Sequence, residues 1–122
     1  PGGTGLTDAP WVAFIGDETA LPVVIRMIEG APEATTGVAT ILVPTRADVQ
    51  TVKAPAGIEV RWAFREDDVT LIDIFRATEV PDGPRYVFFA GEKAEAALAR
   101  EHGVKLGLKR GEIHALAYWT AH

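Results

Sequence analysis

The apolar stretch that ends at Gly16 and passes into a polar turn constrains the fold of this chain more than any other segment. Residues 11–16 have the composition of a buried strand, residues 17–19 are polar, and Pro22 suits the first turn of a helix that follows. A strand that leads directly into a helix is the first half of a βα unit. In α/β proteins, nucleotides bind at this kind of junction, where the helix N-terminus faces the ligand.

Strand and helix patterns alternate along the rest of the chain. The expected strands are residues 11–16, 38–43, 58–64, 86–90 and 113–119. They are nearly continuous in apolar residues, which is typical of a parallel sheet that helices cover on both faces. The sequence therefore predicts an α/β fold: a three-layer parallel β-sheet of about five strands with helices on both faces.

Three helices are expected between these strands. Apolar residues at helical spacing predict the first helix, at Leu21, Val24, Ile25 and Ile28, and the second, at Leu71, Ile74 and Phe75. The second helix is expected to be capped by Asp67 and Asp68, and the third is expected over residues 92–101.

Length and composition indicate one folded domain. At 122 residues, the chain is long enough to bury a core of its own. Residues 1–9 lack apolar periodicity and have the composition of a linker or an expression remnant. The domain is therefore expected over residues 10–122.

The composition excludes several classes of function. The absence of cysteine rules out disulfides, thiol nucleophiles and iron–sulfur clusters. A formal net charge of -5 gives nucleic-acid phosphates no long-range attraction. No apolar run approaches the ~20 residues of a membrane helix, so a cytoplasmic location is expected. The three histidines lack ligand spacing, so no metal site is expected, and His102 is expected to interact with a helix dipole.

The residues that follow the expected strands are the candidate site. In a parallel sheet, ligands bind outside the carboxyl ends of the strands, and these ends lie at one edge. The sequence places at this edge Gly16 to Thr19, Pro44 to Arg46, Arg65, Gly91 with Glu92, and Trp119. The pattern predicts a nucleotide-sized ligand, although sheets of this kind carry many functions.

Three motifs resemble those of a known family. They are Gly16-Asp17-Glu18-Thr19-Ala20-Leu21-Pro22, Ala90-Gly91-Glu92 and Tyr118-Trp119. Together they resemble the nicotinamide-nucleotide half of the siderophore-interacting protein family, whose members are FAD-dependent NAD(P)H reductases of ferric siderophores. The resemblance implies a ferredoxin-reductase-like domain that passes hydride from NAD(P)H to FAD, after which the Fe(III)-siderophore is reduced to Fe(II) and iron is released.

The resemblance covers one half of the family's architecture. A flavin-binding β-barrel normally precedes this domain in the family, and the present 122 residues cannot supply its strands. The chain is therefore expected to be either an excised domain of a longer reductase or a one-domain relative.

The resemblance also implies roles for the motifs. Gly16 to Pro22 match the turn that approaches the nucleotide pyrophosphate, and Ala90 to Glu92 match residues that border the nicotinamide ring. Tyr118 and Trp119 match an aromatic pair near the flavin and nicotinamide. Because successive side chains of a strand point to opposite faces of the sheet, at most one of the two is expected to contact a cofactor ring. No catalytic residue is expected, because hydride transfer needs two rings to be stacked and shielded from water.

Two carboxylates in the first turn conflict with phosphate binding. A helix N-terminus attracts an anion, but Asp17 and Glu18 repel one. We therefore expect them to accept hydrogen bonds from ribose hydroxyls or backbone amides, while Thr19 offers its hydroxyl and amide to the ligand. The alternatives are purely structural: Asp17 or Thr19 caps the helix, Gly91 takes an unusual dihedral angle, and one aromatic residue fills the core.

Arg46 bears on the choice of nucleotide. It follows the second strand, where related sheets read the adenosine ribose, and an arginine there suits the 2′-phosphate of NADPH. NADPH is therefore expected ahead of NADH. Arg65 is a second candidate for this phosphate, and its alternative is a solvated ion pair with the acidic residues 66–68.

Two functions of other classes are alternatives. A phosphoacceptor receiver domain needs an aspartate after the third strand and a lysine after the last, and residues 64–65 and 119–120 supply neither. A non-catalytic nucleotide-binding or subunit-docking module without redox activity stays open. In that case, a homodimer is expected to bury the sheet edge that a barrel would otherwise cover.

Overall fold

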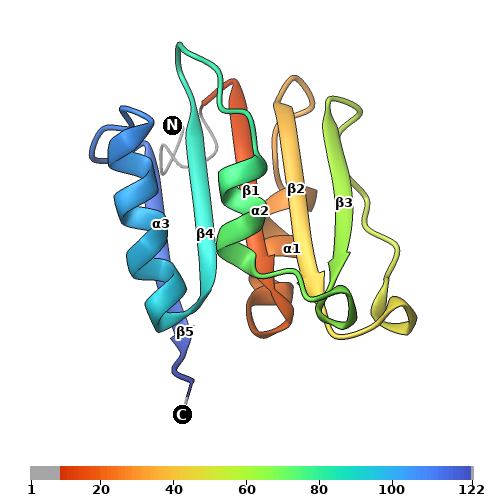
Figure 1. The fold of residues 1–122 in the computed structure, drawn as a ribbon. Helices are drawn as coiled ribbons and strands as arrows, with labels where there is room; N and C mark the ends of the chain where they lie inside the picture. The colour runs from red at the N-terminus through yellow and green to blue at the C-terminus, as the bar shows by residue number, and fades with distance from the viewer. Residues whose placement is uncertain (1–8, 122) are drawn as a thin grey trace.

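The computed structural model describes residues 9–121 as one sheet flanked by helices (Figure 1). The strands are β1 (Trp11–Asp17), β2 (Thr36–Val43), β3 (Ile58–Phe64), β4 (Tyr86–Glu92) and β5 (Ile113–Trp119), and the helices are α1 (Leu21–Glu29), α2 (Leu71–Ala77) and α3 (Lys93–Lys105). Short 3-10 turns follow three strands: η1 (Glu18–Ala20), η2 (Arg46–Asp48) and η3 (Arg65–Asp67). The linker expected at residues 1–9, apart from Ala9, lies outside the described residues.

Within residues 9–121, the sheet has five parallel strands in the order β3-β2-β1-β4-β5. Their carboxyl ends lie together at the bottom of Figure 1. The register aligns these ends, since Asp17 pairs with Leu42 and Gly91 pairs with Ala117. The α/β fold predicted from the sequence is confirmed, and the segments after the strands emerge at one edge.

Helices cover both faces of the sheet. Helix α1 packs on one face through Val24 and Ile28, in a core cluster that includes Phe14 of β1. Helices α2 and α3 pack on the opposite face, where Phe75 and Ala99 join a second cluster. In Figure 1, α2 and α3 lie in front of the sheet and α1 lies behind it. The two clusters bury the apolar residues of the central strands, which is the main source of stability in such a domain.

Strand β5 is less buried than its apolar sequence predicts. Ala115 is buried beneath α3, but Leu116, Tyr118 and Trp119 are exposed. The reason is position: β5 is an edge strand, and α3 covers one of its faces. An apolar sequence does not distinguish an edge strand from a central one.

Two helix boundaries differ from the sequence prediction. Thr70 caps α2, whereas Asp67 lies in η3 and Asp68 adopts a left-handed backbone conformation with φ of 60°. Helix α3 starts one position later than expected and continues to Lys105, with Glu92 as its N-cap. None of the helices in the described part of the chain is long and apolar enough to cross a membrane.

His102 lies in the last turn of α3, where the helix dipole favours a cation, but its surroundings favour the neutral ring. The ring meets Phe75 edge-on, with centroids 4.7 Å apart. Burial, followed by repulsion from Arg76 and Lys105, lowers the pKa of His102 below its ordinary value of 6.5. Burial is the largest cause of this shift toward the neutral ring.

This shift predicts a pH dependence of stability. Because the unfolded chain binds the His102 proton more readily, the free energy of unfolding should fall as the pH drops below 6.5. Urea unfolding at a series of pH values above and below 6.5 measures this dependence. The His102→Gln variant should lose part of the dependence, while His114→Gln, which changes an exposed histidine, should retain it. Equal dependence in all three proteins would contradict the prediction.

Candidate functional site

The turn after β1 is held by its own carboxylate. Asp17 is fully buried, and its Oδ1 atom accepts hydrogen bonds from the Thr19 amide at 2.9 Å and from the Thr19 hydroxyl. Asp17 therefore caps η1, as the structural alternative predicts. Both Thr19 donors that were expected to serve a ligand are bonded to Asp17.

The residues around this turn fix how α1 meets the sheet. A Cβ atom at Gly16 would lie 2.7 Å from Cγ2 of Val24, so glycine allows α1 to approach β1 closely. Ala20 is buried, Leu21 is half-buried and Pro22 lies in the first turn of α1. These three residues shape the start of the helix.

Asp17, Glu18, Thr19, Arg65 and Trp119 form one group, here termed the Asp17 cluster. Asp17 Oδ2 accepts hydrogen bonds from Trp119 Nε1 at 2.8 Å and from Arg65 Nη2 at 3.2 Å. Arg65 Nε donates to Glu18 Oε1 at 3.0 Å, and the guanidinium lies 5.8 Å from the centroid of the Trp119 ring. The cluster thus joins the carboxyl ends of β1, β3 and β5 through charge-assisted bonds.

Two expectations change with this geometry. Arg65 pairs with Asp17 and Glu18 rather than with residues 66–68. Tyr118 and Trp119 are 39% and 37% exposed, so neither aromatic residue fills the core. Of these two, Trp119 joins the Asp17 cluster.

Close packing determines the surroundings of the second motif, Ala90-Gly91-Glu92. Gly91 lies within β4, and its φ is not in the left-handed region, so the structural alternative of an unusual dihedral angle at Gly91 is wrong. A Cβ atom at Gly91 would instead lie 2.7 Å from Leu71 Cδ2 and 3.1 Å from Asp17 Oδ2. Its neighbour Ala90 is fully buried. Glycine at this position therefore allows the Leu71 side chain and the Asp17 carboxylate to lie close to β4.

Glu92 begins α3. Its Oε1 atom accepts a hydrogen bond from the Glu95 amide at 3.1 Å, and its Oε2 atom accepts one from the Ala121 amide at 3.4 Å. A backbone hydrogen bond from Ala94 is the main reason that the pKa of Glu92 lies below its ordinary range. Glu92 thus serves as a helix cap next to the Asp17 cluster.

Arg46 is already paired with two carboxylates. Its Nη1 donates to Glu66 Oε2 at 2.8 Å, and its Nη2 donates to Asp67 Oδ2 at 2.8 Å. The guanidinium also lies over the Phe64 ring, 4.5 Å from the centroid. The hydrogen bond to Asp67, and then the one to Glu66, raise the pKa of Arg46. The acidic partners expected for Arg65 are thus the partners of Arg46.

A cleft of about 380 Å³ lies beside the Asp17 cluster, between the start of α1 and the segment after β2. We term it the Pro44 cleft, and its walls include Leu21, Pro44, Ala47 and Val49 together with the acidic residues Glu18 and Asp48. Among the described residues that line it, none is Lys or Arg. The cleft therefore combines apolar walls with hydrogen-bond acceptors.

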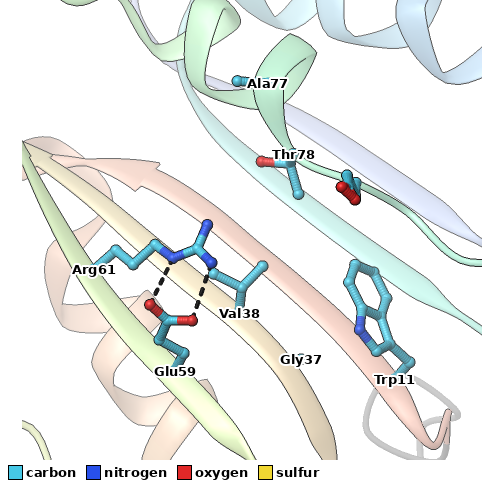
Figure 2. A pocket seen from close by; sticks show the side chains of 8 residues that line it. Trp11, Gly37, Val38, Glu59, Arg61, Ala77 and Thr78 are labelled. Carbon is cyan, nitrogen blue, oxygen red and sulfur yellow. Dashed lines mark hydrogen bonds and ion pairs between the residues drawn. The ribbon is translucent and has the colours of Figure 1, made fainter.

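A second cavity, of about 330 Å³, lies at the opposite edge of the sheet, where the strands begin. Figure 2 shows the side chains that line it. Trp11 and Gly37 line it at the amino ends of β1 and β2, and Glu59 forms a double hydrogen bond with Arg61 at 2.9 Å. Sequence reasoning did not single out this cavity, because no motif marks it. Within residues 9–121, no group of three His, Asp or Glu residues suits a metal ion.

Comparisons with known sequences connect this geometry to a family. The sequence profile described as Siderophore-interacting protein matches residues 9–122. Uncharacterized proteins of Mycobacterium bovis and Mycobacterium tuberculosis are 31% identical to this chain, in a match that covers 75% of this chain and 38% of each relative. The chain therefore spans little more than a third of the length of these relatives.

Solved structures share the fold. The siderophore-interacting protein SipS from Aeromonas hydrophila is 30% identical with a TM-score of 0.78, over 93% of this chain and 52% of that protein. A siderophore utilization protein from T. fusca is 30% identical with a TM-score of 0.80, over 93% of this chain and 46% of that protein. The siderophore-interacting protein from Acinetobacter baumannii shares the fold, with a TM-score of 0.78 and 17% identity. The match covers 98% of this chain and 48% of that protein. Because the profile match extends over nearly the whole sequence, this chain belongs to the siderophore-interacting protein family.

Proposed function

We propose that this chain is the NAD(P)H-binding part of a flavin-dependent ferric-siderophore reductase. The observation that carries the proposal is the Asp17 cluster, which ties the first βα turn to the exposed Trp119 indole at the carboxyl edge of the sheet. Parallel α/β sheets bind nucleotides at this edge. Membership of the siderophore-interacting protein family supports a relation to siderophores.

The residues present suit the two ends of a nicotinamide nucleotide. The Pro44 cleft has apolar walls for an adenine ring, and its Glu18 and Asp48 carboxylates can accept hydrogen bonds from ribose hydroxyls. Trp119 offers an exposed aromatic face for the nicotinamide ring. The Thr19 amide contributes less to the pyrophosphate, because Asp17 already accepts its hydrogen bond.

When bound, the two cofactors would supply hydride transfer from NAD(P)H to FAD, followed by one-electron reduction of Fe(III) in the siderophore. The part proposed for this chain is to bind, orient and shield. Asp17 holds the Trp119 indole in one orientation, which reduces the motion left to a ring stacked on it. FAD and the ferric siderophore are assigned to a flavin-binding barrel that joins this chain in a cytoplasmic reductase.

Calorimetric titration of the chain with NADH and NADPH tests the proposal. At least one nucleotide should bind, and Trp119→Ala should weaken its binding by about tenfold, because stacking on an aromatic side chain is lost. Trp11→Ala is the matched control, since Trp11 lies at the opposite edge of the sheet and should leave the affinity unchanged. A folded chain that binds neither nucleotide would overturn the proposal.

A further inference from the structure

We propose that this chain selects NADH over NADPH. The inference rests on the proposed function and concerns the place where the adenosine ribose would lie. NADPH differs from NADH by a phosphate on the 2′ oxygen of this ribose, so the charge around that oxygen decides between them. The side chains after β2 and β3 set this charge.

Arg46 is held away from the Pro44 cleft. Its neighbour Ala47 lines the cleft, but Arg46 does not. Its guanidinium forms ion pairs of 2.8 Å with Glu66 and with Asp67, and Glu66 also accepts a hydrogen bond from the Arg46 backbone amide at 3.2 Å. Together with the Phe64 ring, these carboxylates bind Arg46 on the β3 side. Arg46 would have to give up both ion pairs to reach a phosphate.

Carboxylates outnumber cations at this part of the edge. The turns after β1, β2 and β3 carry the acidic residues Asp17, Glu18, Asp48, Glu66, Asp67 and Asp68. The same turns carry Arg46 and Arg65, which leaves a formal charge of -4. Arg65 is itself paired with two of these carboxylates. A phosphate dianion placed here is repelled, whereas a neutral ribose diol is not.

Asp48 is a residue of the cleft lining whose carboxylate is fixed by hydrogen bonds from Thr45. Its Oδ2 atom accepts hydrogen bonds from the Thr45 amide at 2.9 Å and from the Thr45 hydroxyl at 3.1 Å. The bond from the amide is one half of a capping box, in which the Thr45 side chain accepts from the Asp48 backbone amide. A carboxylate after the second strand is the feature by which sheets of this type bind an unphosphorylated ribose. The Pro44 cleft therefore recognises the ribose hydroxyls of NADH.

Titration of the 122-residue chain with each nucleotide at low salt tests this selectivity. NADH should bind about tenfold more tightly than NADPH. Both nucleotides carry an anionic pyrophosphate, but only NADPH adds a 2′-phosphate beside the carboxylates of these turns. The double variant Glu66→Gln with Asp67→Asn removes two charges while keeping hydrogen-bond acceptors, and it releases Arg46. This variant should bind NADPH about tenfold more tightly than the parent chain and bind NADH with little change.

The matched control is Glu33→Gln with Glu101→Gln, which removes the same charge from exposed positions outside these turns. It should leave the ratio of the two affinities unchanged. If NADPH binds the parent chain as tightly as NADH, or if the Glu66 and Asp67 variant leaves NADPH affinity unchanged, the inference fails and the proposed function stands. If neither nucleotide binds, both fail.

Discussion

Replacing Asp17 with alanine is expected to lower the free energy of unfolding by about 3 kcal/mol, because a buried charged acceptor with several donors is lost. Asp17 is fully buried and accepts hydrogen bonds from Thr19, Arg65 and Trp119. The variant leaves these donors without their acceptor. This loss of stability is at the lower end of the range for breaking a buried ion pair, because the Arg65 side chain is 32% exposed and water can solvate it.

Urea unfolding of the parent chain and of two variants measures this effect. Asp17→Asn is the matched control, because the amide keeps one oxygen acceptor and nearly the same volume, and it should lose clearly less stability than Asp17→Ala. Under the proposed function, Asp17→Ala should also weaken NADH binding, since the Trp119 indole loses its hydrogen-bond acceptor. A loss below about 1 kcal/mol in Asp17→Ala would mean that the cluster contributes no more than a surface ion pair.

Replacing Gly37 with alanine is expected to cost about 4 kcal/mol or more and to leave little folded protein, because backbone atoms cannot move aside as a flexible side chain can. A Cβ atom at Gly37 would lie 1.9 Å from the carbonyl oxygen of Val12. Gly37 pairs with Val12 between the adjacent strands β1 and β2, so relieving the overlap would separate these strands. The backbone φ of 144° adds strain for any side chain.

Gly83→Ala separates the two causes. Gly83 also has a positive φ, of 90°, but a Cβ atom there would meet no atom within 4 Å. This control should lose about 1 kcal/mol from backbone strain alone. Thermal unfolding and soluble yield compare the two variants. Equal stability of Gly37→Ala and Gly83→Ala would show that the close approach of β1 and β2 is not required.

The fold could be predicted because its signals are local. The strand at residues 11–16 is a continuous apolar run, and Gly16 and Pro44 stand where such runs end. A parallel sheet then brings these ends to one edge whatever the order of the strands. Strand order and the exposure of β5 depend on contacts between distant segments, which a run of apolar residues does not record.

The partners of the charged residues could not be predicted, because they lie far apart in the sequence. The structural alternative for Arg65 is an ion pair with the adjacent residues 66–68, but Arg65 donates to Asp17, 48 positions away. Trp119 donates to the same carboxylate across 102 positions. Arg46, the candidate contact for the 2′-phosphate of NADPH, meets Glu66 because β2 and β3 are neighbours. The sequence alone suggests ion pairs between neighbouring residues, whereas the sheet brings together residues that are far apart in the sequence.

NMR spectroscopy of the ¹⁵N-labelled chain during titration with NADH shows where the nucleotide binds. If the carboxyl edge of the sheet is the site, the signals of the Trp119 indole, the Thr19 amide and residues around the Pro44 cleft shift together. The Trp11 indole, which lines the cavity at the opposite edge in Figure 2, then keeps its position. Shifts that gather around Trp11 instead, or unchanged signals at a large excess of NADH, would contradict a nicotinamide-nucleotide site at the Asp17 cluster.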